Sequence, residues 1–292
     1  MTIRLVVTDM DGTLYSWIDY IVPAVESMVE AVCKATALPR IRVVQALKAV
    51  YTKYESNEYP FALQESQLFK EFPDFGSFDK LVIEPARMSF AEARKKYLRP
   101  YKGVVETLEA LKAQGIPVVA LTDAPRNPAE QRLKKMKLDQ HLVALYALPG
   151  FHFPKNEEGE ALVAPDILQR QERGEYKPLC DVVELPRDAE KPSRLGIDAI
   201  CAKYQVPARD VLVVGDSIKK DIAMAQSAGA VDCWAEYGTY ISLEYRERLD
   251  IISAPAITRR HAASVYDAGT VVKPTHALSN FCQVLDIVAK HR

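Results

Sequence analysis

The sequence has no closely spaced cysteine pair. Its five cysteines are dispersed along the chain, their number is odd, and none forms a CxxC motif. Zinc ribbons depend on closely spaced cysteines, and disulfide frameworks usually use an even number of them. The pattern therefore argues against both and favours a reducing compartment, so we expect a cytosolic protein.

The chain also lacks a large excess of charge of one sign and a long apolar run. Its 38 basic and 39 acidic residues leave a formal net charge of -1, which argues against broad electrostatic binding to nucleic acid or anionic lipid. No apolar run is long enough to span a bilayer, and no N-terminal signal pattern is present. We therefore expect neither nucleic acid nor a membrane among its partners.

Several widespread catalytic and nucleotide-binding motifs are absent. The sequence contains no GxGxxG, no GxxxxGK[ST], no GxSxG and no HExxH. Each of these motifs provides the geometry on which its enzyme class depends. Any catalytic role must therefore rest on a different arrangement of side chains.

Two carboxylates follow the first apolar run of the chain. Residues 3–8 are predicted to form a buried strand, and Asp9, Asp11 and Gly12 come directly after it. Carboxylates two residues apart on a turning backbone can face one pocket, where one attacks a phosphorus atom and the other moves the proton. The alternative is a polar turn in which the aspartates bond to local amides.

Strands and helices are predicted to alternate after residue 100. The predicted strands are 117–121, 143–148 and 211–214, and the predicted helices include 126–138, 197–204 and 219–228. This alternation predicts an α/β fold with a doubly wound, mostly parallel sheet that helices cover on both faces. Ligands bind beyond the carboxyl ends of the strands in such sheets, where Asp9, Thr122 and Asp216 all lie.

Helices alone are predicted between the first strand and this alternating part. Apolar residues recur at helical spacing in 23–38 and 43–54, and residues 60–72 and 77–97 are more helix-like than strand-like. Residues 16–98 therefore read as an all-helical insertion into an alternating α/β chain.

We predict two domains from this organisation. Residues 1–15 and 99–292 would form the α/β catalytic core, and residues 16–98 a smaller α-helical cap. Within the core, prolines make a long regular helix improbable in residues 149–190, which we expect to leave the alternation as a short hairpin or flap.

A second acidic motif, Gly215 to Asp221, follows the last clear strand. Asp216 and Asp221 could help to hold a hard cation, because such cations prefer oxygen ligands. Magnesium in particular can neutralise phosphate charge and orient it for in-line attack. Capping of the following helix by Asp216 or Ser217 is the alternative, and both readings can hold at once.

Two further positions carry groups that suit a phosphate. Thr122 ends a strand and precedes Asp123, so its hydroxyl and the free amides of this turn could bond phosphate oxygens; an ordinary helix cap is the alternative. Lys191, just before a helix, could meet a phosphate and hold the nucleophilic carboxylate, although most lysines are solvated. Lys177, also followed by proline, competes with Lys191 for this role.

These four signals, in this order, resemble the haloacid dehalogenase superfamily of phosphohydrolases. The matching features are DxDGT at residues 9–13, a strand-terminal Thr122, Lys191, and GDxxxxD at residues 215–221. The helical insertion after the first motif looks like the first cap type of that family, as in phosphoglycolate phosphatase-like members. The resemblance implies a Rossmann-like core with a cap and a Mg²⁺ cofactor.

The resemblance also implies a role for each matching residue. Asp9 would be the nucleophile that forms an aspartyl-phosphate, and Asp11 would protonate the leaving alcohol and later activate water. Asp9, the backbone carbonyl of Asp11, and Asp216 would bind magnesium, and Asp221 would support its ligand shell. The phosphate-binding group would be Thr122, Asp123 and Lys191.

We therefore predict a magnesium-dependent phosphohydrolase that cleaves phosphate monoesters of small metabolites. The dehalogenases of the family lack an aspartate at the position of Asp11, so phosphoryl transfer is preferred over carbon–halogen cleavage. A phosphomutase, a phosphonate hydrolase using a cap lysine (Lys34, Lys48 or Lys53) and a non-catalytic binding protein remain alternatives. The sequence does not indicate an oligomeric state.

Overall fold

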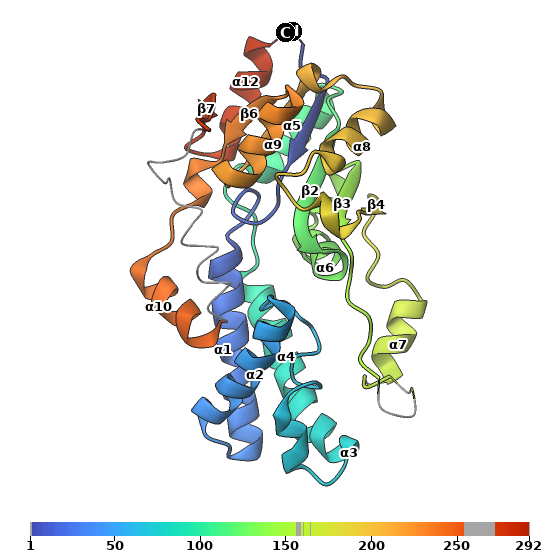
Figure 1. Ribbon diagram of the computed structural model, residues 1–292, viewed down its shortest axis with the longest axis vertical. Helices are drawn as coiled ribbons and strands as arrows, with labels where there is room; N and C mark the ends of the chain where they lie inside the picture. The colour runs from blue at the N-terminus through green and yellow to red at the C-terminus, as the bar shows by residue number, and fades with distance from the viewer. Residues whose placement is uncertain (1, 156–158, 160, 164, 254–271, 292) are drawn as a thin grey trace.

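One parallel sheet organises the core of the protein. The computed structural model describes residues 2–155, 159, 161–163, 165–253 and 272–291. Within this part of the chain, seven strands pair in the order β4-β3-β2-β1-β5-β6-β7, and every pairing is parallel (Figure 1). The strands are β1 (Leu5–Thr8), β2 (Val118–Pro125), β3 (Ala144–Leu148), β4 (Asp181–Glu184), β5 (Val211–Gly215), β6 (Val231–Trp234) and β7 (His276–Ala277).

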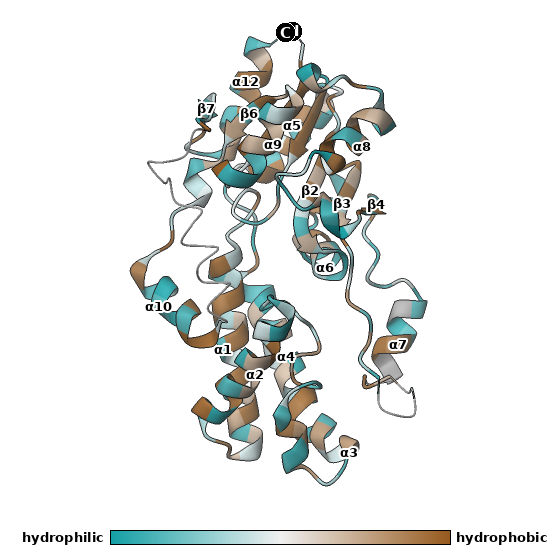
Figure 2. Cartoon of the chain, viewed as in Figure 1, coloured by the Kyte–Doolittle hydropathy of each residue, from teal (hydrophilic) through white to brown (hydrophobic). Residues whose placement is uncertain are grey.

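Helices cover both faces of this sheet, which confirms the predicted α/β fold class. The core helices are α5 (Val104–Ala113), α6 (Arg126–Met136), α8 (Leu195–Tyr204), α9 (Ala223–Ala228) and α12 (Val284–Lys290). Successive strand residues point to opposite faces. Val6 accordingly packs in the same cluster as residues of α5, α6 and α12, whereas Leu5 and Val7 pack with α8 and α9. Figure 2 shows β1 as apolar, as burial on both faces requires.

The strand register brings three chain segments to one edge of the sheet. β1 lies between β2 and β5, and Thr8 pairs with Ala120 on one side and Val214 on the other. Asp9 follows Thr8 directly, and its backbone amide donates to the carbonyl of Val214 at 2.8 Å. The segments that leave β1, β2 and β5 therefore start beside one another.

Residues 16–98 contain helices and no strand. They form α1 (Trp17–Thr36), α2 (Arg40–Tyr54), α3 (Phe75–Phe78) and α4 (Glu84–Tyr97), and we call this segment the helical insertion. The hydroxyl of Ser16 begins α1 by accepting from the amide of Asp19 at 3.2 Å, as an N-cap does. α1 packs along α4, and the insertion extends away from the sheet (Figure 1).

Residues 60–72, which are more helix-like than strand-like in sequence, contain no strand and no α-helix. The segment consists of turns and a short 3₁₀-helix, Gln67–Glu71. The hydroxyl of Ser66 donates to the carbonyl of Leu63 and accepts from the amide of Leu68, so a new turn starts at Ser66. Local side-chain bonds of this kind compete with a continuous helix.

Residues 149–190 contain more regular structure than the sequence indicated. The helix α7 (Pro165–Glu172) begins at a proline, which its first turn tolerates. Lys155 and Ala161 form an isolated antiparallel bridge. Residues 181–184 form β4, the edge strand beside β3, so the alternation resumes before the predicted end of this stretch.

Two segments outside residues 16–98 contact the helical insertion. Phe151, after β3, packs edge-on against the rings of Tyr54 and Tyr59. The helix α10 (Leu243–Ile252) lies against α1, where Arg248 pairs with Glu26 at 2.6 Å (Figure 1). Among the described residues, no helix has both the length and the apolar character needed to cross a membrane.

Candidate active site

Three carboxylates meet at the carboxyl edge of the central strands. One oxygen each from Asp9, Asp216 and Asp221 can be chosen so that all three lie within 4.8 Å of one another. Gly12 (φ 75°) passes so close that a Cβ atom there would lie 2.4 Å from Asp216 Oδ2. The glycine of the first motif therefore allows the loop after β1 to pack on the second acidic motif.

Lys191 is the cation that faces this cluster. Its Nζ donates to Asp9 Oδ1 at 2.5 Å, to Asp221 Oδ1 at 2.6 Å and to the carbonyl of Leu121 at 3.2 Å. Its side chain is 3% exposed. Burial opposes its charge, but the carboxylates of Asp221 and Asp9 outweigh this and raise the pKa of Lys191. The side chain therefore remains a cation in contact with Asp9 and Asp221.

The cluster holds more negative charge than one lysine can neutralise. Burial raises the pKa of Asp9 to about 7, although Lys191 lowers it, and the neighbouring Asp221 and Asp11 raise it further. Burial also raises the pKa of Asp216, and the charge of Asp9 adds to the effect. An all-oxygen donor set crowded in this way suits a hard divalent cation.

Asp11 lies at the same loop, but its carboxylate faces other partners. The hydroxyl of Tyr15 donates to Asp11 Oδ1, and Nη2 of Arg132 lies 3.5 Å from Oδ2. A small pocket of about 50 Å³ opens beside Asp11. Its lining also includes Gly12, Trp17, Asp216 and Tyr240, among others. The Asp11 side chain thus stands beside a space next to the carboxylate cluster.

Thr122 and Asp123, two of the predicted phosphate-binding residues, make different contacts in the structure. Thr122 is buried, and its hydroxyl accepts from the amide of Ala124 at 3.1 Å within β2. The alternative of an ordinary helix cap is wrong, because α6 begins after Pro125 with no side-chain capping bond. The carboxylate of Asp123 accepts from the Lys191 amide at 3.0 Å and from Lys220 Nζ at 2.8 Å. Because a carboxylate repels phosphate, only the backbone of Asp123 suits that role, while its side chain holds Lys191 in place.

The competing lysine lies elsewhere in the fold. Lys177 is exposed and follows α7; its amide donates to the carbonyl of Gly174 and its own carbonyl accepts from Lys134. Nothing in these contacts joins Lys177 to the carboxylate cluster, whereas Lys191 touches two of its members.

Sequence reasoning missed Arg132, the largest fully buried side chain of the described residues. The basic helix 126–138 reads as a solvated face, yet Ala129, Leu133 and Met136 mark its buried side. Position 132 falls within that stripe, three residues after Ala129 and four before Met136. This periodicity was the signal that could have identified a buried arginine.

The segment after β6 packs against the loop after β1. The hydroxyl of Tyr237 donates to the carbonyl of Thr13 at 2.6 Å. A Cβ atom at Gly238 would lie 1.5 Å from the carbonyl oxygen of Gly12. Only glycine fits here, because the atoms that a side chain would meet belong to the backbone and cannot move aside as the end of a flexible side chain can.

We expect Gly238→Ala to lower the free energy of unfolding by about 2–3 kcal/mol and to reduce activity, because the added methyl group displaces the loop carrying Asp11 and Gly12. Denaturant unfolding and turnover measure the two effects. Gly76→Ala in α3 is the matched control, since its Cβ would be 3.3 Å from the nearest atom, a side-chain oxygen. Equal behaviour of the two variants would contradict the close packing.

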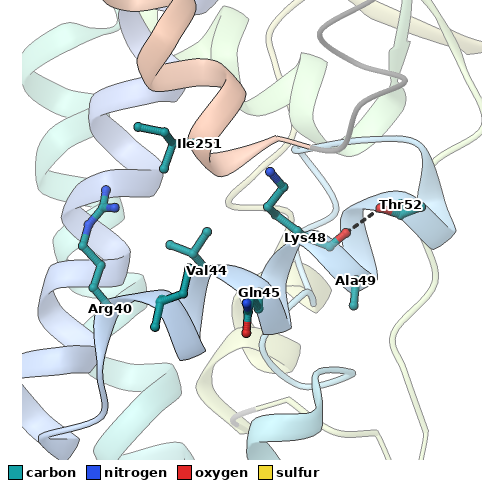
Figure 3. A pocket seen from close by; sticks show the side chains of 8 residues that line it. Arg40, Val44, Gln45, Lys48, Ala49, Thr52 and Ile251 are labelled. Carbon is teal, nitrogen blue, oxygen red and sulfur yellow. Dashed lines mark hydrogen bonds between the residues drawn. The ribbon is translucent and has the colours of Figure 1, made fainter.

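A larger pocket of about 800 Å³ lies between α2 and α10 (Figure 3). Its walls include Arg40, Val44, Lys48 and Ile251. None of the residues of the carboxylate cluster lines it. Volume alone therefore does not place the chemistry there, and the candidate site remains at the edge of the sheet.

Comparisons with known proteins agree with this geometry. The profile of the haloacid dehalogenase-like hydrolase family matches residues 3–229. No curated protein sequence matches the chain. Similar solved structures include a 2-haloacid dehalogenase from Pseudomonas syringae pv. Tomato DC3000, with 16% identity, a TM-score of 0.59 and 100% of each chain covered.

Another similar structure is a HAD phosphatase from Thermococcus onnurineus, with 14% identity and a TM-score of 0.54, covering 99% of this chain and 100% of that one. At these identities the two structures show a shared fold and do not choose between their activities. The family profile covers most of the chain, including all four sequence motifs. The chain belongs to the haloacid dehalogenase-like hydrolase family.

Proposed function

We propose that the protein is a magnesium-dependent phosphohydrolase that cleaves phosphate monoesters of small metabolites through an aspartyl-phosphate at Asp9. The observation that carries the proposal is a second carboxylate, Asp11, which follows Asp9 in the same loop and lines a pocket together with Asp216. A halide departs as an anion and needs no proton, whereas an alkoxide leaving group does. A site that keeps a proton donor next to its nucleophile therefore favours phosphate esters over haloacids.

In the first step, a carboxylate oxygen of Asp9 attacks phosphorus as the bond between phosphorus and the ester oxygen breaks. The carboxyl group of Asp11 gives its proton to the departing oxygen. In the second step, Asp11 takes a proton from a water molecule that attacks the aspartyl-phosphate. The bond between phosphorus and the Asp9 oxygen then breaks, which releases phosphate and restores both side chains.

The remaining residues of the site hold charge in place. The Lys191 ammonium, which contacts Asp9 Oδ1, is placed to bind a phosphate oxygen during transfer. Asp9, Asp216, Asp221 and the carbonyl of Asp11 would hold Mg²⁺, whose charge, when bound, offsets that of the phosphate and keeps it oriented. The pocket of about 50 Å³ beside Asp11 favours a small leaving group.

The structure lends no support to a phosphonate-cleaving lysine in the helical insertion. Lys53 pairs with Glu65 at 2.8 Å, and Lys48 donates to the carbonyl of Asp250 at 3.0 Å. Lys34 is exposed in the last turn of α1. A Schiff-base lysine works best when it is desolvated in the site, and these positions do not provide that environment.

We expect phosphate release from a panel of phosphorylated metabolites that depends on Mg²⁺ and stops in excess chelator. Magnesium added after the chelator should restore the rate. Two-carbon and three-carbon phosphates should be turned over better than nucleoside monophosphates, since the pocket beside Asp11 is small. Full activity in chelator, halide release from haloacids, or return of the phosphoryl group to a sugar would each contradict the proposed reaction.

A further inference from the structure

Arg132 is a buried cation outside the four sequence motifs. It lies on α6, and its side chain is 1% exposed. Burying a guanidinium costs several kcal/mol unless charged partners compensate. Nη1 donates to Glu58, and Nη2 lies 3.5 Å from Asp11 Oδ2. Burial opposes the charge, but Asp11 and Glu58 outweigh it and raise the pKa of Arg132.

The two partners of Arg132 belong to different parts of the chain. Glu58 lies in the helical insertion, in the turn after α2, and Asp11 lies in the loop after β1. Arginine and a single carboxylate frequently pair through two parallel hydrogen bonds. The guanidinium is instead shared between the insertion and the catalytic loop.

The contact with Asp11 is an ion pair without a hydrogen bond. A distance of 3.5 Å exceeds the usual hydrogen-bond range, and neither Nε nor Nη2 of Arg132 has a hydrogen-bond partner within the described residues. The other oxygen of the carboxylate, Oδ1, accepts from the hydroxyl of the fully buried Tyr15. The carboxyl group of Asp11 is thus held between a tyrosine hydroxyl and a guanidinium.

We propose that Arg132 is a positioning residue that fixes the orientation of the Asp11 carboxyl group. Because Glu58 of the helical insertion in turn pairs with Arg132, this orientation depends on the insertion being docked. The inference rests on the proposed phosphohydrolase function, because it assigns Asp11 the task of protonating a leaving group. Arg132 itself touches neither Asp9 nor the predicted metal ligands Asp216 and Asp221 in the contacts described for it.

A pair of substrates that differ in the leaving group tests this role. Ethyl phosphate and acetyl phosphate have similar size and shape. Ethoxide needs a proton as it departs, whereas acetate leaves as a stable anion, so only the first substrate depends strongly on Asp11. The ratio kcat/KM is the quantity to compare, because it reports only the steps up to and including the first irreversible one, the transfer of phosphorus to Asp9.

We expect Arg132→Met to lower kcat/KM for ethyl phosphate roughly 10- to 100-fold, a part of what general acid catalysis contributes. For acetyl phosphate, we expect a change of less than about threefold. Asp11→Asn supplies the reference pattern of selective loss. Lys135→Met is the matched control on the same helix, since Lys135 is an exposed cation; it should leave both substrates unaffected.

Arg132→Met leaves Glu58 buried without its cation, which is destabilising, so the double variant Glu58→Gln with Arg132→Met is measured as well. It removes both charges, which is commonly close to neutral for stability, and it should retain the selective loss. Equal loss on both substrates, or no loss on either, would overturn the role of Arg132. Wild-type protein that cleaves neither compound would instead contradict the proposed function itself.

Discussion

Replacing Asp9 with Asn is expected to abolish phosphate release from every substrate that the wild-type protein cleaves, by at least about 10⁴-fold. The amide is nearly the same shape as the carboxylate but cannot attack phosphorus or form an aspartyl-phosphate. Turnover of the best substrate of the phosphate panel, with saturating Mg²⁺, measures the effect. A variant that kept near-normal activity would show that Asp9 is not the nucleophile.

The stability of the same variant separates lost chemistry from lost fold. Burial raises the pKa of Asp9 from 3.8 to about 7, so the folded state holds this proton where the unfolded chain has released it. Protonation of Asp9 therefore contributes to the free energy of unfolding below pH 4, and this contribution is lost as the pH rises through about 7. In chelator at pH 8, we therefore expect a Tm for Asp9→Asn equal to or above that of the wild type. A much lower Tm would mean that inactivity reports unfolding.

The central strands and the site at their ends could be predicted because their sequence signals are unambiguous. Leu5–Thr8 and Val211–Gly215 are buried along their whole length, and each is a short apolar run followed by Asp or Gly-Asp. Parallel strands buried on both faces require such runs. Two acidic motifs that end adjacent strands necessarily meet, so Asp9 and Asp216 come together as expected.

The outer strands lacked that signal. β4 is an edge strand whose two ends are exposed, so its residues do not form an apolar run. β6 carries the buried Asp232, a residue that strands disfavour. Its carboxylate accepts from the amide and the hydroxyl of Thr275, 43 residues later. Gln226 Nε2 donates to the same carboxylate at 3.2 Å, and together these partners make its burial tolerable. Local sequence does not show the contact with Thr275.

The contact between the helical insertion and the catalytic loop is also invisible in local sequence. Glu58 and Arg132 are 74 residues apart, and each by itself has the character of a solvated surface residue. Their pairing depends on how the fold holds the turn after α2 against Arg132 of α6. Under the proposed roles of Asp11 and Arg132, such a pair would couple docking of the helical insertion to chemistry, in the way that closure often completes an active site.

Lys191→Ala is expected to lower turnover about 10²- to 10³-fold, which is the usual effect of removing one preorganised charged or hydrogen-bonding group from a site of charge transfer. Lys177→Ala is the matched control and should leave turnover unchanged, because Lys177 is exposed and has no contact with the carboxylate cluster among those described. Rates of both variants at saturating substrate and Mg²⁺ decide between the two lysines.

The stability of Lys191→Ala should reveal why the lysine is buried. Its Nζ contacts both Asp9 and Asp221, and removing it leaves these carboxylates buried without their cation. Breaking a buried ion pair from one side costs about 3–5 kcal/mol. A divalent cation bound by the same carboxylates would offset much of that loss. We therefore expect the Tm of Lys191→Ala to rise far more with Mg²⁺ than that of Lys177→Ala; equal responses would mean that lysine and metal do not share these carboxylates.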